Sequence, residues 1–298
     1  MLTGEQVLIL GGDARQFEVM KKLVALHANV TVCGFEQCHH PLDGVLQVDF
    51  QPEVMQGKNR IILPAAGIDE QGLIASPFGN QPIQLTADHI AQLSKDAVIY
   101  TGMARSNLQQ MCAEQKISLI ELFERDDIAI MNSIPTAEGA LVMAIENTNF
   151  TIHQSRAIVL GFGRTGFTMA RVLHALGAKV KVGLRKPDQF ARAVEMGLEP
   201  FYIKDFEHHL SNIDLIFNTI PTMIVTAQII VNMPKNAVII DLASKPGGTD
   251  FDFAAQHGVK AILAPGLPGI VAPQTAGRII ADCLAQLMID DISNRRNE

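Results

Sequence analysis

With 298 residues, the chain is long enough for two domains of about 150 residues each. Hydrophobic residues make up 48% of it and charged residues 18%, which predicts large buried cores and excludes a mainly disordered protein. The formal net charge is -7 and no basic stripe stands out, so nucleic acid is not an expected partner.

Short apolar segments alternate with amphipathic helical segments through the first half of the chain. The predicted strands are residues 6–10, 29–34, 60–65, 97–102 and 117–123. Such alternation is typical of a parallel sheet with helices on both faces. We therefore predict a first Rossmann-like domain over residues 1–130, either flavodoxin-like or carrying catalytic groups.

The first turn of this domain, "GGDARQ" at residues 11–16, lacks the third glycine of the dinucleotide fingerprint. We therefore expect no nucleotide in this domain. Arg15 lies at the N-terminus of the predicted helix, where backbone amides favour an anion. The alternative use of this turn is to hold a substrate carboxylate.

Residues 131–150 are predicted to form a connector helix between the domains. Residues 132–136 are interpreted as a turn, with Pro135 or Thr136 opening the helix. Leu141, Val142 and Ile145 provide its apolar stripe. Side chains on this helix are expected to face a cleft between the domains.

The second half repeats the alternation. Its predicted strands are residues 156–161, 179–185, 200–203, 215–220, 237–243 and 260–265. This pattern predicts a second doubly wound domain over residues 151–273, followed by a long amphipathic helix, 274–298, that packs back on the first domain. The predicted fold class is therefore α/β, with two Rossmann-like domains joined by a connector helix and a cleft between them.

A complete G-x-G-x-x-G pattern follows the first strand of the second half, at Gly161, Gly163 and Gly166. The strand before it and the helix after it supply the context that this motif requires. The first glycine permits the tight turn, the second lets the backbone approach a pyrophosphate, and the third lets the helix lie against the strand. This unit predicts a nicotinamide dinucleotide site.

The acid that usually binds the adenosine ribose would fall near residues 184–185, where the chain has Arg185 and Lys186. A guanidinium at this position attracts a 2′-phosphate that a carboxylate would repel. NADP is therefore favoured over NAD. The alternative is that Arg185 projects into solvent and NAD binds without the acid.

Three later loops follow strands at the same sheet edge and complete the predicted cofactor site. They are "NTIPT", "DLASKPGGTD" and "APGLPGIVAPQTAG". The full set of predicted cofactor contacts is Gly161, Gly163, Arg164, Thr165, Gly166, Arg185, Lys186, Thr219, Ile220, Pro221, Ala243, Pro265 and Gly266.

Several long motifs resemble the A-subunit family of bacterial dipicolinate synthases over about residues 4–285. They are "GGDARQ", "LFERDDIAIMNSIPTAEGALVMAI", "GFGRTGFTMAR", "IDLASKPGGTDF" and "APGLPGIVAPQTAG". The second half alone is also similar to the NAD-binding domains of adenosylhomocysteinase, alanine dehydrogenase and D-2-hydroxyacid dehydrogenases.

The resemblance implies an oxidoreductase in the mother cell of a sporulating bacterium. Its reaction would be the NADP-dependent oxidation of dihydrodipicolinate, or of its hydrated precursor from the lysine pathway, to dipicolinate. The resemblance also implies a separate partner, a flavoprotein-like B subunit. In addition, we expect a homo-oligomer.

This reaction requires a group that accepts a proton and groups that hold two carboxylates. The catalytic candidates are Glu138, Lys245 and Asp127, with Asp126 beside the last. The alternatives are a helix-capping role for Glu138, a solvated loop for Lys245 and an ion pair of Asp127 with Arg125. The candidate substrate contacts are Arg15, Arg125, Ser133 and Thr136.

Two other functions compete with this interpretation. A D-2-hydroxyacid or alanine dehydrogenase-like enzyme would need a catalytic histidine near the last loop, which "PGLPGIVAPQTAG" does not contain. A protein that binds NADP without catalysis is the second alternative, and the sequence does not exclude it.

Four scattered cysteines suggest reduced thiols, and the chain start shows no secretion signal, so a cytoplasmic location is expected. Cys33, Cys38, His39 and His40 match no zinc-binding spacing, so no metal is predicted. No apolar run of about 20 residues stands out, and a membrane is not expected as a partner.

Overall fold

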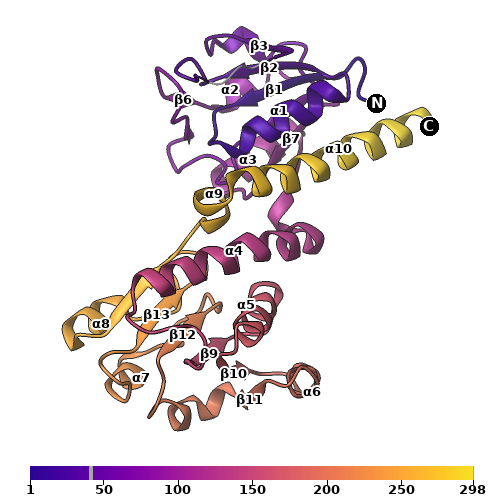
Figure 1. Cartoon of the computed structure of the whole chain (residues 1–298). Helices are drawn as coiled ribbons and strands as arrows, with labels where there is room; N and C mark the ends of the chain where they lie inside the picture. The colour runs from indigo at the N-terminus through magenta and orange to yellow at the C-terminus, as the bar shows by residue number, and fades with distance from the viewer. Residues whose placement is uncertain (40–42, 298) are drawn as a thin grey trace. The chain divides into compact units, whose positions relative to one another are not determined.

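The computed structural model describes residues 1–39 and 43–297 of the chain and contains two compact units (Figure 1). Unit 1 comprises Met1–Ile128 and Ala272–Glu298, and unit 2 comprises Ala129–Val271. Among the described residues, each unit is built on one parallel six-stranded sheet with helices around it. The predicted fold class of two doubly wound α/β domains is confirmed.

The sheet of unit 1 has the strand order β3-β2-β1-β4-β7-β8. Its strands are β1 (Gln6–Leu10), β2 (Asn29–Cys33), β3 (Val45–Gln47), β4 (Arg60–Ile62), β7 (Val98–Thr101) and β8 (Ser118–Glu121). In β1, Leu8 pairs with Thr31 of β2 and with Ile61 of β4. The strand order reverses between β1 and β4, so the loops at their carboxyl ends flank the position where α/β sheets bind ligands.

The C-terminal helix completes the core of unit 1. The helical segments of this unit are α1 (Arg15–Ala25), η1 (Pro52–Met55), α2 (Ala87–Ile90), α3 (Ser106–Gln115), η2 (Leu122–Glu124) and α10 (Pro273–Asn297). Figure 1 shows α10 running beside α1, and the two helices are in contact. Ile280, Leu284 and Met288 of α10 are buried in the same cluster as Val7 and Leu23. Each such side chain contributes about 1.5–3 kcal/mol on burial.

A buried arginine fastens α10 to the sheet. The side chain of Arg60 in β4 has no exposed surface, and its Nε lies 2.7 Å from Glu5 Oε2. Its Nη2 donates to Asp291 Oδ2 on α10 at 2.5 Å. Arg295, one turn further along α10, pairs with Asp291 and with Asp96. These contacts compensate the charges that burial takes out of water.

Unit 2 repeats the topology of unit 1 with the order β11-β10-β9-β12-β13-β14. Its strands are β9 (Arg156–Leu160), β10 (Lys179–Leu184), β11 (Glu199–Tyr202), β12 (Leu215–Asn218), β13 (Val238–Asp241) and β14 (Lys260–Leu263). Its order reverses between β9 and β12, in parallel register from Ala157↔Leu215 to Leu160↔Asn218. The predicted glycine turn directly follows β9, at this switch point.

The helices of unit 2 include one that the sequence did not predict. They are α5 (Arg164–Ala175), α6 (Pro187–Glu195), η3 (Ile203–His209), α7 (Ala227–Val231), α8 (Phe251–His257) and α9 (Leu267–Val271). The Pro- and Gly-rich segment 264–277 was interpreted as a loop, but α9 lies inside it. Gly139 allows α9 to approach closely, because a Cβ at this glycine would lie 3.0 Å from the Cβ of Leu267.

Helix α4 spans Asp126–Glu146, so it begins about ten residues before the predicted start at Pro135 or Thr136. The predicted turn at residues 132–136 lies inside this helix. Proline lacks an amide hydrogen, which suggested a helix start at that point. Two hydroxyl groups instead bond to carbonyl groups near the proline: Thr136 Oγ1 donates to Asn132 O at 2.7 Å, and Ser133 Oγ donates to Ile130 O at 2.6 Å.

By length and hydropathy, α4 could cross a membrane, with 21 residues and a mean hydropathy of 1.5 in its most apolar window. This helix contradicts the expectation that no apolar run of about 20 residues stands out in the sequence. Core helices of soluble proteins meet the same criterion, and Ala137, Ala140 and Ala144 are buried in the core of unit 2. A single such helix is therefore weak evidence for a membrane.

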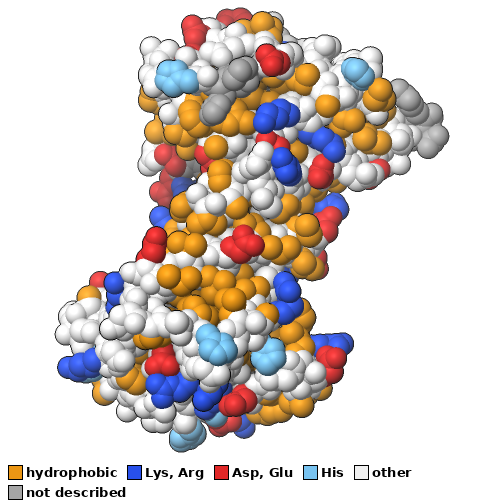
Figure 2. Space-filling model, viewed as in Figure 1, with side chains coloured by type: hydrophobic (Ala, Val, Ile, Leu, Met, Phe, Trp, Pro, Cys, Tyr) orange, Lys and Arg blue, Asp and Glu red, His pale blue; other side chains and the backbone are white. Residues whose placement is uncertain are grey.

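Large apolar side chains are nevertheless exposed along α4. They are Ile130, Met131, Ile134, Val142 and Ile145, with exposures between 40% and 59%. Figure 2 shows hydrophobic side chains gathered over the region where α4 runs in Figure 1. Several large apolar side chains exposed on one helix are typical of an interaction face.

Candidate cofactor and substrate sites

The glycine turn of unit 2 has a different reason for each glycine. Gly161 has φ +92°, and a Cβ there would lie 2.5 Å from Thr219 Oγ1. A Cβ on Gly166 would collide with the carbonyl oxygen of Gly161, so this glycine lets α5 pack on β9. Gly163 has an ordinary φ of -85° and open space where its Cβ would be. Neither backbone strain nor packing within the chain therefore requires a glycine at 163.

The open space at Gly163 suits a dinucleotide. The exposed residues Gly163 and Arg164 lead into α5, whose first-turn amides have no partners within the helix. Thr165, the next predicted contact, is half-buried in the same turn. Such a helix N-terminus stabilises a diphosphate through its amides and its dipole. The residues present therefore fit the diphosphate of a nicotinamide dinucleotide.

Two cations follow the second strand of the same sheet. Leu184 ends β10 as a buried residue, and Arg185 and Lys186 after it are exposed. In the described part of the chain, neither of these side chains has a hydrogen bond or an ion pair. Gln189 Nε2 donates to the Phe162 carbonyl at 3.3 Å and links this segment to the glycine turn. Both cations thus remain available to a ligand.

A buried polar network, which the sequence analysis missed, fixes the loops after β12 and β13. Asp241 Oδ2 accepts hydrogen bonds from Asn218 Nδ2 at 3.0 Å, Gly248 N at 2.9 Å and Thr249 Oγ1 at 2.6 Å. Its Oδ1 accepts one from Ala243 N at 3.1 Å. Asn218 also bonds the loop ahead of it, through Ile220 N and Ile220 O. The sequence signal was a polar residue ending each of two apolar strands, "LIFN" and "VIID".

Several predicted cofactor contacts lie in the loops at this same edge of the sheet. Thr219 is anchored to Leu160 O through both its amide, at 3.0 Å, and its hydroxyl, at 2.8 Å. Pro221 is exposed in the loop after it. Pro265 and Gly266 are exposed beyond β14, just before α9. The loops after β9, β12, β13 and β14 thus all leave the carboxyl edge of one sheet, where parallel sheets bind ligands.

The three catalytic candidates occupy different settings. Glu138 is exposed on α4, and Lys245 is exposed in the loop after β13. No hydrogen bond or ion pair among the described residues joins these two side chains. Asp127, in unit 1, forms the ion pair with Arg125 that the sequence analysis gave as the alternative, at 2.8 Å. Its hydrogen bond from Arg125 holds the pKa of Asp127 below its ordinary value, which makes it a weak proton acceptor.

The predicted substrate contacts already have partners within the chain. Arg15 forms a two-pronged ion pair with Asp13, at 2.9 and 2.7 Å. Ser133 is buried and shares a 2.6 Å hydrogen bond with Thr168 of α5, so its hydroxyl packs two helices together. Thr136 donates to its own helix, and Arg125 is held by Asp127. These contacts argue against the predicted role of Ser133 in binding a carboxylate.

In unit 1, a segment of the chain itself fills the crevice at the switch point. The hairpin of β5 (Leu73–Ile74) and β6 (Ile83–Gln84) lies against the turn after β1. The amide of Gly12 donates to Ala75 O at 2.7 Å, in the turn where a Rossmann domain binds phosphate. After β2, Glu36 accepts hydrogen bonds from the amides of Asn80 and Gly34, each at 2.9 Å. This segment thus makes the polar contacts that a nucleotide would otherwise make.

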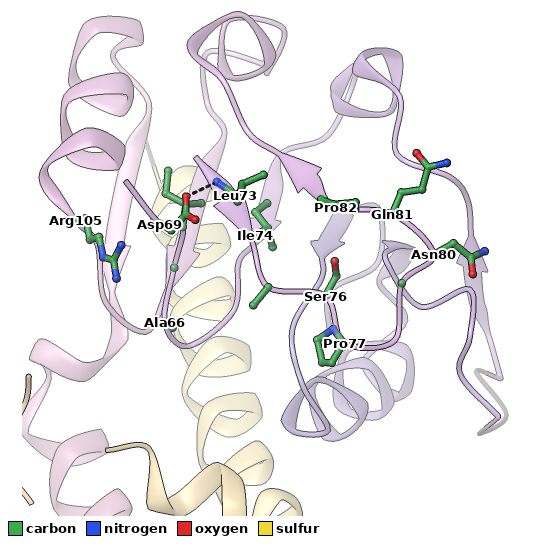
Figure 3. A pocket seen from close by; sticks show the side chains of 14 residues that line it. Ala66, Asp69, Leu73, Ile74, Ser76, Pro77, Asn80, Gln81, Pro82 and Arg105 are labelled. Carbon is green, nitrogen blue, oxygen red and sulfur yellow. Dashed lines mark hydrogen bonds between the residues drawn. The ribbon is translucent and has the colours of Figure 1, made fainter. Parts of the chain in front are cut away.

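Beside this hairpin, unit 1 has a pocket of about 620 Å³ (Figure 3). The loop after β4, the hairpin and Arg105 line it. Figure 3 shows Arg105 on one side, and Ser76 with Asn80 and Gln81 on the other. None of these residues has a role predicted from the sequence, because they are far apart in the chain and belong to no motif.

For metals, the described residues contain no group of three or more His, Cys, Asp or Glu side chains suited to an ion. Of the residues considered for zinc, Cys33 is fully buried and burial raises its pKa to about 12. His40 lies outside the described residues.

Two family models match the chain. The first describes the N-terminal domain of the A subunit of dipicolinate synthase and matches residues 6–123. The second, the alanine dehydrogenase/PNT C-terminal domain, matches residues 137–289. The second match supports an oxidoreductase with a nicotinamide cofactor, because it covers the glycine turn and the loops around it.

Known proteins are similar over nearly the whole chain. The A subunit of dipicolinate synthase from Bacillus subtilis (strain 168) is 45% identical over 97% of this chain and 98% of its own length. The crystal structure of the corresponding A subunit from Bacillus halodurans has 48% identity and a TM-score of 0.93, with 97% and 99% of the two chains covered. A transhydrogenase from Sinorhizobium meliloti shares the fold, with 14% identity, a TM-score of 0.68 and coverage of 95% and 94%.

Proposed function

The chain belongs to the family of dipicolinate synthase A subunits, and from that premise we propose that it oxidises dihydrodipicolinate, or its hydrated precursor from the lysine pathway, to dipicolinate with NADP as the oxidant. The observation that supports this most directly is the glycine turn of unit 2. Gly163 has no reason within the chain to be glycine, and its open side adjoins the N-terminus of α5. A diphosphate accounts for both features.

We propose NADP rather than NAD because of the two cations that follow β10. Arg185 and Lys186 have no partners among the described side chains, at the position where NAD-binding domains usually have an acid. A guanidinium can bind a 2′-phosphate with two parallel hydrogen bonds. Unpaired cations at this position would attract the 2′-phosphate of NADP. The family match does not distinguish NADP from NAD, so these two residues are the basis of our choice.

The chemistry divides between the cofactor and the chain. A bound nicotinamide supplies the hydride acceptor. Dihydrodipicolinate and NADP⁺ thus give dipicolinate, NADPH and a proton. The chain has to orient the ring, hold its two carboxylates and receive the proton. The gain of an aromatic ring favours the products, so positioning accounts for much of the catalysis.

Glu138 and Lys245 remain our candidates for the proton acceptor. Both side chains are exposed, and neither has a hydrogen bond or an ion pair in the described part of the chain. Asp127 is the weakest of the three candidates, because Arg125 stabilises its ionised form and lowers its pKa. The hydrated precursor would need an acid in addition, to release water from the ring.

We also propose that the protein works in the cytoplasm of the mother cell together with a flavoprotein-like B subunit. The word subunit in the names of its relatives supports a multi-subunit enzyme. The apolar side chains exposed along α4 support a homo-oligomer. Light scattering of the purified chain, with and without the B subunit, measures both associations.

The deciding experiment supplies freshly generated dihydrodipicolinate together with NADP. Formation of NADPH at 340 nm and of dipicolinate in the near ultraviolet should then rise together in equal amounts. The reaction is run with and without the B subunit, and with NAD in place of NADP. Retained NADP binding without turnover under all of these conditions would instead support a protein that binds the cofactor without catalysis.

A further inference from the structure

The pocket of unit 1 lies at the carboxyl edge of the sheet, beside the switch-point crevice that the hairpin fills. Its lining comes from the loop after β4, the hairpin at residues 73–82 and Arg105 after β7. β4 and β7 are neighbouring parallel strands, so these loops meet at the carboxyl edge of the sheet. Its volume of about 620 Å³ lies in the range of small-molecule sites.

Arg105 differs from the other arginines of unit 1. Each other arginine there whose side chain is described forms an ion pair with an acid of the same unit: Arg15, Arg60, Arg125, Arg278 and Arg295. Arg105 is exposed at the pocket and has no partner among the described residues. An unpaired guanidinium in a pocket is a binding group for a carboxylate.

Two acids of the flanking segments, Asp69 and Glu121, are committed to other donors, and Glu70, beside Asp69, is exposed and forms no ion pair with Arg105. Asp69, which also lines the pocket, accepts hydrogen bonds from the amides of Leu73 at 2.8 Å and Gln71 at 2.9 Å. Glu121 accepts from Ala104 N and Gln109 Nε2, each at 2.8 Å. These bonds shape the loops on both sides of Arg105, and neither of these carboxylates bonds to its guanidinium.

We propose that this pocket binds a carboxylate of the substrate, with Arg105 as its cationic partner. This inference rests on the proposed function, because it takes the substrate to be a small cyclic dicarboxylate. It assigns to Arg105 the role that the sequence analysis gave to Arg15 and Arg125, both of which are paired with acids. Ser76, whose hydroxyl has no hydrogen bond within the described chain, lies on the opposite wall (Figure 3).

The test uses dipicolinate itself as the probe, titrated calorimetrically into the full-length protein without NADP. Arg105→Gln should weaken binding by roughly tenfold or more, because a charge-assisted hydrogen-bond pair is lost. Arg105→Lys should restore part of the affinity, since it keeps the charge without the planar fork. Arg171→Gln, a change of the same kind at an exposed arginine of α5, serves as the control and should bind as the wild type does.

The NADP affinity of Arg105→Gln should stay unchanged, since the predicted cofactor residues lie in unit 2. Equal dipicolinate affinity in Arg105→Gln and the wild type overturns the assignment of this pocket. So does an absence of dipicolinate binding by the wild type at concentrations up to the millimolar range. The proposed function is tested separately by turnover of dihydrodipicolinate with NADP, so failure of the pocket assignment and failure of the proposed function remain distinguishable.

Discussion

Replacement of Asp241 with Ala tests whether the buried network of unit 2 holds the two loops assigned to the cofactor. Asp241 is fully buried, and four donors bond to its carboxylate. In the variant, the Thr249 hydroxyl can rotate and Asn218 keeps its bond to Ile220 O at 2.9 Å. The buried amides of Ala243 and Gly248 have no other acceptor among the described residues.

Each buried donor left without a partner costs about 1–3 kcal/mol. Two such amides predict that Asp241→Ala lowers the free energy of unfolding of unit 2 by about 2–6 kcal/mol. Asp241→Asn should lose less, because its amide oxygen can still accept the bonds made to Oδ2. The loops after β12 and β13 should also become more mobile in the variant. NADP binding should then weaken, because binding has to offset the entropy lost when these loops become ordered.

Differential scanning calorimetry measures the stability, and hydrogen exchange of residues 219–225 and 243–250 locates the change. Asp252→Ala is the control, because Asp252 is exposed in the first turn of α8 and its loss should cost about 0.5 kcal/mol. An Asp241→Ala protein within about 0.5 kcal/mol of the wild type, with unchanged exchange in both loops, would refute the reasoning.

Three further substitutions test other parts of the molecule. Arg185→Ala should weaken NADP binding by roughly tenfold or more and leave NAD binding nearly unchanged. The control Arg171→Ala should change neither affinity. A ratio of the dissociation constants for NADP and NAD that is the same in Arg185→Ala and the wild type would contradict the 2′-phosphate assignment. Asp291→Ala should lower the free energy of unfolding of unit 1 by about 3 kcal/mol, because Arg60 is left half-paired while buried, and Asp290→Ala on the exposed face of α10 should have little effect in the same urea titration. The hydrogen bond from Arg156 holds the pKa of Asp214 below its ordinary 3.8, so the stabilisation by this ion pair is present above that pH and is lost as the pH falls through the lowered pKa. Asp214→Asn should therefore be less stable than the wild type at neutral pH and equal to it in strong acid, and a constant difference across the acid titration would count against this pair.

The sequence predicted the sheets well because their strands are buried on both faces. Runs such as "VLIL" and "AIVL" have no competing helical period, and glycines mark where they end. β3 was missed because it is only three residues long and mostly exposed. The start of α4 was wrong because Pro135 gives a strong local signal, while burial of Ala137 and Ala140 stabilises the helix around it.

The site was predictable only where a motif carries it. The glycine turn and the cations at the end of β10 follow from local spacing. Asp241 bonds to Asn218, 23 positions away, and to Gly248, 7 positions away across a loop. No local sequence pattern predicts either hydrogen bond. Arg105 stands out only when the other described arginines of unit 1 are seen to be paired, which requires a three-dimensional structure.

The hairpin in the crevice of unit 1 explains why residues 11 and 34 are glycines. A methyl group on Gly11 would lie 2.8 Å from the carbonyl oxygen of Ala75, and one on Gly34 would lie 2.9 Å from Ile83. The glycines of this incomplete dinucleotide fingerprint are thus needed to accommodate the hairpin of the chain itself. The two units share a scaffold but differ at the switch point of the sheet. In unit 1 a hairpin of the chain fills this crevice, whereas in unit 2 the crevice is left open to a ligand from solution.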